Sequence, residues 1–146
     1  MEASTEHLLI LRRFFIEFSD RLQIISEAVD SKKGLDPTVL DLRGLSSELD
    51  AFFICHGTST RHVKAVADAI EEKLIEIREK PLFVEGLKEG TWVLMDCGDV
   101  GVHIFDEKIR DYYRLEELWS HAPILDMKTT SSAPNSISCL ELEDTL

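Results

Sequence analysis

Apolar side chains recur every three to four residues in three parts of the chain, which is the spacing of amphipathic helices. The first part, residues 6–33, holds two such series in succession. The second begins at Thr58 or Ser59, either of which can cap a helix, and its apolar stripe continues to Ile77. The third is EKIRDYYRLEELW, residues 107–119. The pattern therefore predicts helices in these three places.

Shorter apolar segments lie between these helices and predict β-strands. Residues 39–45 alternate between apolar and polar side chains and predict a short edge strand, whereas AFFICHG (51–57) predicts a buried strand. PLFVEG (81–86) predicts a third strand, and residues 91–96 and 101–106 predict a hairpin about the CGDVG turn. This order of elements predicts an α/β fold with a mixed β-sheet of about five strands flanked by helices.

The two ends of the chain differ in composition from its middle. Residues 1–21 are predicted to form an N-terminal helical extension or arm, and residues 22–122 a single domain. Residues 123–146 are rich in Ser and Thr and end in acidic residues, which predicts a disordered acidic tail. The overall composition, with 44% hydrophobic and 30% charged residues, is typical of a globular protein.

Charge and cysteine content narrow the classes of partner and compartment. The 28 acidic residues outnumber the 16 basic ones, for a net charge of −12. Direct binding to nucleic-acid phosphates needs a basic patch, so we expect no direct DNA binding. A basic partner would be attracted, although acidic charge also serves solubility alone. Three cysteines without CxxC spacing indicate reduced thiols and a cytoplasmic location, and no apolar run is long enough for a membrane.

A Gly-Thr-Ser turn before the second helix is the first candidate for chemistry. A helix N-terminus after Gly57 is where phosphate groups bind, and nucleotidyltransferases place a Gly-Ser turn there. The P-loop consensus is absent, however, and the paired carboxylates that hold catalytic metals are missing, because Asp96 and Asp99 are three residues apart across a turn. An enzyme or phosphate-binding protein that uses Gly57, Thr58 and Ser59 stays as the alternative to a binding protein.

Other potential ligands and nucleophiles are scattered through the chain. The candidates are His56, His62, Cys97, His103 and His121. None of them shows compact metal-ligand spacing, so we predict no metal and no cofactor. Cys97 could lie near His103 across the turn, but the flanking Asp96 and Asp99 would disfavour a reactive thiolate.

The hairpin is the strongest candidate for a binding face. Because side chains alternate along a strand, one face is aliphatic and the other combines Trp92, Leu94 and Asp96 with His103 and Phe105. Aromatic anchors with polar groups at their edge are typical of protein interfaces. The alternative is that a helix covers this face and Trp92 belongs to the core.

Three segments together resemble the ribosomal silencing factor family, also called Iojap or RsfS. They are DLRGLSSELDAFFICHGTSTRHVKAVADAIEEKL (41–74), WVLMDCGDVGVHIF (92–105) and IRDYYRLEELW (109–119). The resemblance covers about residues 22–122. This chain departs from the common family pattern at four positions: Ala51, His56, Cys97 and Gly101.

This resemblance implies a fold related to nucleotidyltransferases without catalytic carboxylates, and a protein that is not an enzyme. It implies binding to a basic protein of the large ribosomal subunit (uL14-type), at the surface that meets the small subunit. Such binding would sterically block subunit joining and repress translation when nutrients are scarce. Members of the family are often homodimers off the ribosome.

The residue pattern and the resemblance together predict a docking surface for the ribosomal protein. Two aspartates, Asp96 and Asp99, are expected to pair with Lys and Arg residues of the partner. The complete set of predicted contact residues is Trp92, Leu94, Asp96, Asp99, His103, Phe105, Tyr112 and Tyr113.

Overall fold

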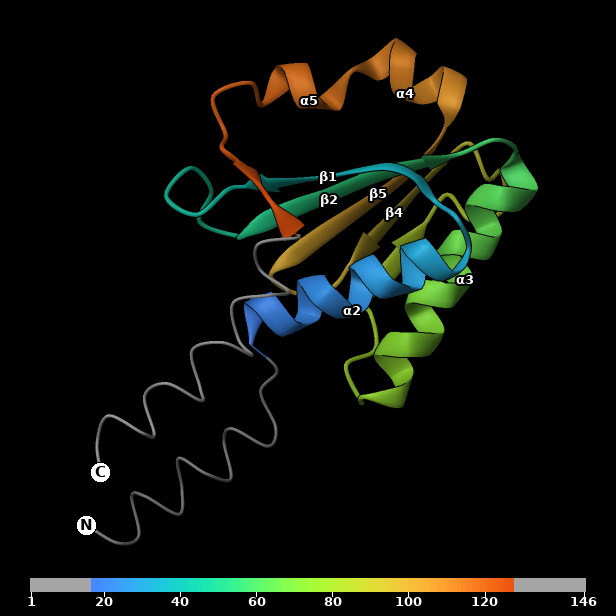
Figure 1. Cartoon of the computed structure of the whole chain (residues 1–146), viewed down its shortest axis with the longest axis horizontal. Coiled ribbons are helices and arrows are strands. Elements are labelled where there is room, and N and C mark those ends of the chain that lie inside the picture. The colour runs from blue at the N-terminus through green and yellow to red at the C-terminus, as the bar shows by residue number, and fades with distance from the viewer. Residues whose placement is uncertain (1–16, 128–146) are drawn as a thin grey trace, which may run out of the picture.

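A computed structural model describes residues 17–127 of the chain and shows one β-sheet with helices on both faces (Figure 1). The strands are β1 (Leu35–Asp41), β2 (Ala51–Gly57), β3 (Phe83–Glu85), β4 (Trp92–Asp96), β5 (Val100–Asp106) and β6 (Ile124–Leu125). The helices are α2 (Phe18–Ser31), α3 (Thr60–Glu76), α4 (Glu107–Tyr113) and α5 (Leu115–Leu118).

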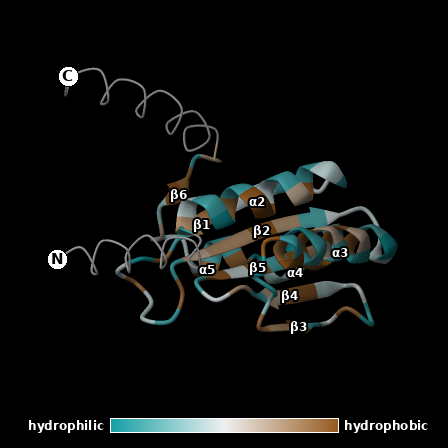
Figure 2. Ribbon diagram, turned by 90° about the horizontal axis from the view of Figure 1, so that it is seen from below, coloured by the Kyte–Doolittle hydropathy of each residue, from teal (hydrophilic) through white to brown (hydrophobic). Residues whose placement is uncertain are grey.

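The sheet is mixed, as the element order predicted, and runs in the order β3-β4-β5-β2-β1-β6 (Figure 2). Strands β2 and β5 are parallel, while the other neighbouring pairs are antiparallel. The sheet has six strands rather than about five, since β6 adds a short pairing to β1. That pairing also corrects the prediction of an edge strand over residues 39–45: β1 starts at Leu35, ends at Asp41 and lies inside the sheet.

Helices α2 and α3 cover one face of the sheet (Figure 1). Ser59 caps α3 by accepting a hydrogen bond from the backbone N–H of His62. The apolar stripe predicted for this helix is buried against the aliphatic face of the hairpin, and Ile77, just past its end, is half-buried. The main core contains the side chains Val63, Val66, Ile70, Leu74, Val93, Met95, Val102 and Ile104. The periodicity of the sequence therefore identified this core correctly.

Helices α4 and α5 lie over the opposite face (Figure 1). The sequence predicted one helix over residues 107–119, but the helix is interrupted at Arg114, whose φ of 47° is left-handed. Arg110 fixes the resulting bend. Its buried guanidinium donates to Glu116, to the Thr38 hydroxyl and to the carbonyl oxygen of Asp36, and so ties α4 and α5 to β1.

The described residues include only part of the predicted arm and of the predicted tail. Residues 1–16, most of the predicted arm, lie outside the described residues, and α2 begins at Phe18, ahead of the predicted boundary at residue 22. At the other end, Ile124 and Leu125 form β6, so ordered structure continues beyond Ala122 into the predicted tail. Residues 128–146 lie outside the described part.

Candidate docking surface

Six aromatic side chains form a continuous strip across the face of the sheet that carries α4 and α5. We call this set the aromatic strip: Tyr112, Tyr113, Trp92, His103, Phe52 and Trp119. Successive ring centroids are between 4.8 and 5.9 Å apart, which is the range of favourable aromatic contacts. The strip runs from α4 across the strands to the end of α5. Residues distant in sequence thus form one surface.

Five of the predicted contact residues are accessible on this face. Tyr112 and Tyr113 are 79% and 48% exposed, and Trp92, Leu94 and Asp96 are half-buried. The ring of Tyr113 lies 4.9 Å from that of Trp92, yet α4 leaves the indole partly open. Trp92 is therefore neither a fully covered core residue nor a free surface side chain. It is a supported aromatic ring, which is the form that interface anchors take.

Phe105 does not belong to the accessible surface, contrary to the prediction. Its side chain is completely buried in a second hydrophobic cluster, where Ile109 and Leu115 also pack. The reason is that α4 starts directly after β5 and folds back over the strand. Strand alternation predicted the correct face of the sheet for Phe105, but it could not predict that α4 would bury the side chain. The ring of Phe105 lies 4.9 Å from that of Trp92, its cross-strand neighbour, and packs against the indole.

Asp99 is also committed within the protein rather than free for a partner. Its carboxylate accepts from the guanidinium of Arg21 on α2, which in turn lies 3.3 Å from Glu79. Its carbonyl oxygen accepts from the backbone N–H of Asp50 at 2.7 Å. Asp96 differs: its Oδ1 accepts only from the backbone N–H of Gly98, and the side chain stays half-exposed. Of the two predicted aspartates, Asp96 alone remains suited to pairing with an external base.

His103 is buried, at 6% exposure, and is fixed as a neutral ring. Its Nδ1 accepts a hydrogen bond of 3.1 Å from the indole N–H of Trp92, so the neutral ring carries its proton on Nε2. Burial lowers the pKa of His103 to about 4, because the charged form loses its hydration. At neutral pH the residue orients Trp92 without adding charge to the surface.

A groove of about 330 Å³ opens beside the aromatic strip, between the hairpin and the loop that precedes β2. Its mainly apolar walls and floor are formed by Leu49, Phe52, Phe83, Leu94, Gly101 and His103. Glu48 and Asp96 line it as acidic residues. The sequence had indicated only Leu94, Asp96 and His103 among these residues.

The residues that sequence reasoning missed come from outside the hairpin. Phe52 shares a face with Ile54 on β2, and the register between β2 and β5 places Ile54 opposite His103. The alternation rule would have found Phe52 had that register been known, but β2 is apolar on both faces. Leu49 lies in a loop, and Phe83 in a strand of three residues, so neither follows a periodic pattern.

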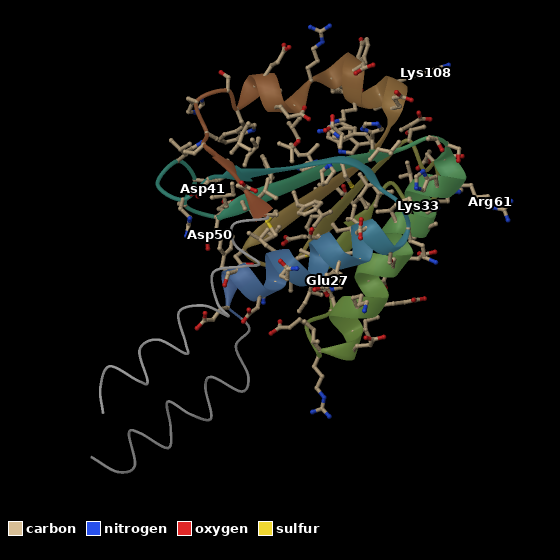
Figure 3. The ribbon with its side chains drawn as sticks, viewed as in Figure 1. Glu27, Lys33, Asp41, Asp50, Arg61 and Lys108 are labelled. Carbon is tan, nitrogen blue, oxygen red and sulfur yellow. The ribbon has the colours of Figure 1, made fainter. Side chains whose placement is uncertain are left out.

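The Gly-Thr-Ser turn uses its hydrogen-bonding groups internally. The backbone N–H of Thr58 donates to Nδ1 of His62 at 3.0 Å, while Nε2 of that ring lies 2.8 Å from the carbonyl oxygen of Lys32. Asp96 and Asp99 lie at the other end of β2, about 20 Å away at the rise of a strand. Figure 3 shows Asp50, just before β2, and Arg61, in α3, at opposite ends of the sheet.

The other candidates for chemistry are also separated in space. Cys97 packs into the main core beneath α2 and α3, whereas His103 lies on the opposite face of the sheet, so the two do not form a nucleophile–base pair. Burial, the largest cause, raises the pKa of Cys97 to about 12. Within residues 17–127, no three His, Cys, Asp or Glu side chains gather in an arrangement that could hold a metal ion.

Comparison with known proteins gives a consistent identification. The family described as "Ribosomal silencing factor during starvation" matches residues 16–140. Ribosomal silencing factor RsfS of Bacillus subtilis is 42% identical over 106 residues, which cover 73% of this chain and 90% of that protein. The chloroplastic protein Iojap of Zea mays is 33% identical over 106 residues, or 70% of this chain and 45% of that protein.

Solved structures agree with the sequence matches. A crystal structure of a Chromobacterium violaceum protein has a TM-score of 0.70 and 37% identity, covering 72% of this chain and 88% of the other. One from Bacillus halodurans has a TM-score of 0.65 and 39% identity, covering 72% and 95%. No helix within residues 17–127 is long and apolar enough to cross a membrane. The chain belongs to the ribosomal silencing factor family (RsfS, or Iojap), whose members are ribosome-associated regulators of translation.

Proposed function

We propose that this protein binds the large ribosomal subunit through a basic ribosomal protein and thereby blocks subunit joining. The observation that carries this proposal is the aromatic strip. It ends in two accessible tyrosines, and its Trp92 side chain is partly exposed on a face of the sheet. Supported aromatic side chains of this kind contribute a large share of binding free energy in protein interfaces.

The charge of the chain supports a basic partner. At a net charge of −12, long-range attraction accelerates encounter with a basic surface. Asp96, beside the strip and without an ion pair among the described residues, is placed to meet a Lys or Arg of that surface. Its contribution should therefore appear in the association rate and in the salt dependence more than in dissociation.

Inhibition by this route needs occupancy and bulk rather than chemistry. A folded domain that covers a subunit-joining surface excludes the other subunit sterically. An interface of about 800 Å² on each partner is enough for specific binding. The homodimer that the family resemblance implies stays a prediction, to be checked by sedimentation equilibrium of the free protein.

A titration of purified large subunits with the Trp92→Ala variant tests the docking surface. Removing a central aromatic anchor should cost about 2 kcal/mol of binding free energy, or about a thirtyfold loss of affinity. Ile75→Ala is the matched control, because Ile75 is also half-exposed and apolar but lies on α3, on the other face of the sheet. Circular dichroism confirms that each variant is folded. Wild-type affinity for folded Trp92→Ala would refute the assignment of the anchor.

Sedimentation of ribosomal particles tests the mechanism of inhibition. The protein should travel with isolated large subunits, be absent from joined ribosomes, and shift an equilibrium mixture toward free subunits. Binding to joined ribosomes would contradict a steric block. Nucleotide turnover with Mg²⁺ that is abolished by changing Thr58 or Arg61 would instead favour the enzymatic alternative.

A further inference from the structure

One buried polar atom beside the groove has no hydrogen-bond partner among the described residues. Nδ1 of His103 accepts a hydrogen bond from the indole N–H of Trp92, whereas its Nε2–H has no hydrogen-bond acceptor. Because the two nitrogens of an imidazole point in nearly opposite directions, Nε2 faces away from Trp92, on the side of the groove that His103 lines. A buried donor without an acceptor destabilises a fold, so this donor calls for an acceptor from outside the folded chain.

The chemistry of the groove defines what would satisfy that donor. The floor at Gly101 has no side chain, and an added Cβ would lie 3.1 Å from the ring of Phe52, so the depth of the groove depends on glycine. The lining is mainly apolar, and Glu48 and Asp96 form no ion pair among residues 17–127. These features match an aliphatic side chain with a neighbouring Lys or Arg, on a backbone whose carbonyl group can accept a hydrogen bond.

We propose that the groove receives an aliphatic side chain of the basic ribosomal protein, and that a backbone carbonyl oxygen of the same segment accepts from Nε2 of His103. This inference rests on the proposed function and deepens it, since it names the chemistry of the segment that is recognised. The adjacent Lys or Arg of that segment pairs with Glu48 and Asp96.

The donor is reached through a movement of Phe52. Nε2 is sealed from water in the free protein, and the half-buried ring of Phe52 meets the imidazole edge to face at 4.8 Å. Rotation of this side chain lets the carbonyl oxygen in, and the entering aliphatic side chain replaces the contacts that Phe52 gives up. The buried donor thereby favours a partner that brings both groups over one that brings only an apolar side chain.

Site-specific photo-cross-linking identifies the occupant. A benzophenone amino acid replaces Phe83, at the groove, in the full chain, and a second variant carries it at Ile75 on α3 as the control. Both are irradiated with purified large subunits. We expect position 83 to attach to an aliphatic residue of a ribosomal protein that has a Lys or Arg nearby, and position 75 not to. Attachment to ribosomal RNA, to a second copy of this chain, or to nothing while binding persists would overturn the inference.

A pair of substitutions isolates the Nε2 donor. His103→Asn keeps an acceptor near the position of Nδ1 for Trp92 but removes the donor, whereas His103→Gln places an amide N–H near the position of Nε2. Affinity for large subunits should be about fivefold lower, or about 1 kcal/mol, for the Asn variant than for the Gln variant. Equal affinities of the two variants would overturn the role of the donor. If the wild-type chain does not bind large subunits at all, the proposed function itself is refuted.

Discussion

Acid should destabilise this protein through the buried imidazole of His103. The folded state holds the ring neutral, 94% buried, with its pKa lowered by burial from 6.5 to about 4. The unfolded chain takes up the proton at about pH 6.5, before the folded chain does. The contribution of this group to stability is therefore fully present above pH 6.5 and is lost as the pH falls toward 4.

The size of this loss follows from the two pKa values. Between pH 7.5 and 5.0, proton uptake by the unfolded state lowers the free energy of unfolding by about 2 kcal/mol. The figure depends little on the folded pKa, because at pH 5.0 a group with a pKa near 4 is still mostly neutral. A change of this size is a large fraction of the stability of a typical domain, about 5–15 kcal/mol.

Urea unfolding at the two pH values, followed by circular dichroism, measures the effect. Other groups titrate in the same range, so the informative quantity is the difference between wild type and a variant without the imidazole. His103→Asn should lose about 2 kcal/mol less than wild type between pH 7.5 and 5.0. His103→Gln should behave in the same way, since it also removes the titrating group. An identical pH dependence in all three proteins would refute the burial of a neutral His103.

The further predictions concern stability and reactivity. Arg110→Met should lower the free energy of unfolding by about 2–3 kcal/mol in urea titrations, because it removes the donor from three acceptors on β1 and α5. Cys55 and Cys97, with thiol pKa values raised by burial to about 12, should stay unlabelled by iodoacetamide at pH 8 until urea unfolds the protein, as mass spectrometry will show. Gly86→Ala should cost more than about 2 kcal/mol in thermal unfolding, because its φ is 83° and the new Cβ would lie 2.0 Å from a carbonyl oxygen of β4. Gly98→Ala, at φ 90° with open space around it, should cost only about 1 kcal/mol.

Local patterns in the sequence were enough to identify most elements of the fold. The apolar stripe after Ser59 has the period of a helix, and the helix starts and packs as that period requires. The alternation in residues 92–96 and 102–105 assigned each of these side chains to its correct face. Such patterns are reliable because backbone geometry alone sets the direction of each side chain.

The helix predicted over residues 107–119 shows what a local sequence pattern cannot predict. Its spacing predicted one continuous helix, and Arg114 carries no sequence signal of a left-handed conformation. The break is decided by the buried guanidinium of Arg110, which binds partners on β1 that are more than 70 residues away. A contact of this sequence separation cannot be read from periodicity.

The candidate docking surface likewise depended partly on the sequence and partly on the tertiary structure. The sequence by itself determined the face on which Trp92, Leu94, Asp96, His103 and Phe105 lie. Only the tertiary structure decided which of the predicted contact residues stay accessible: α4 folds back to bury Phe105, and Arg21 on α2 engages Asp99. The physical reason is that strand geometry fixes direction, whereas exposure and ion pairing depend on what other segments bring to the same place.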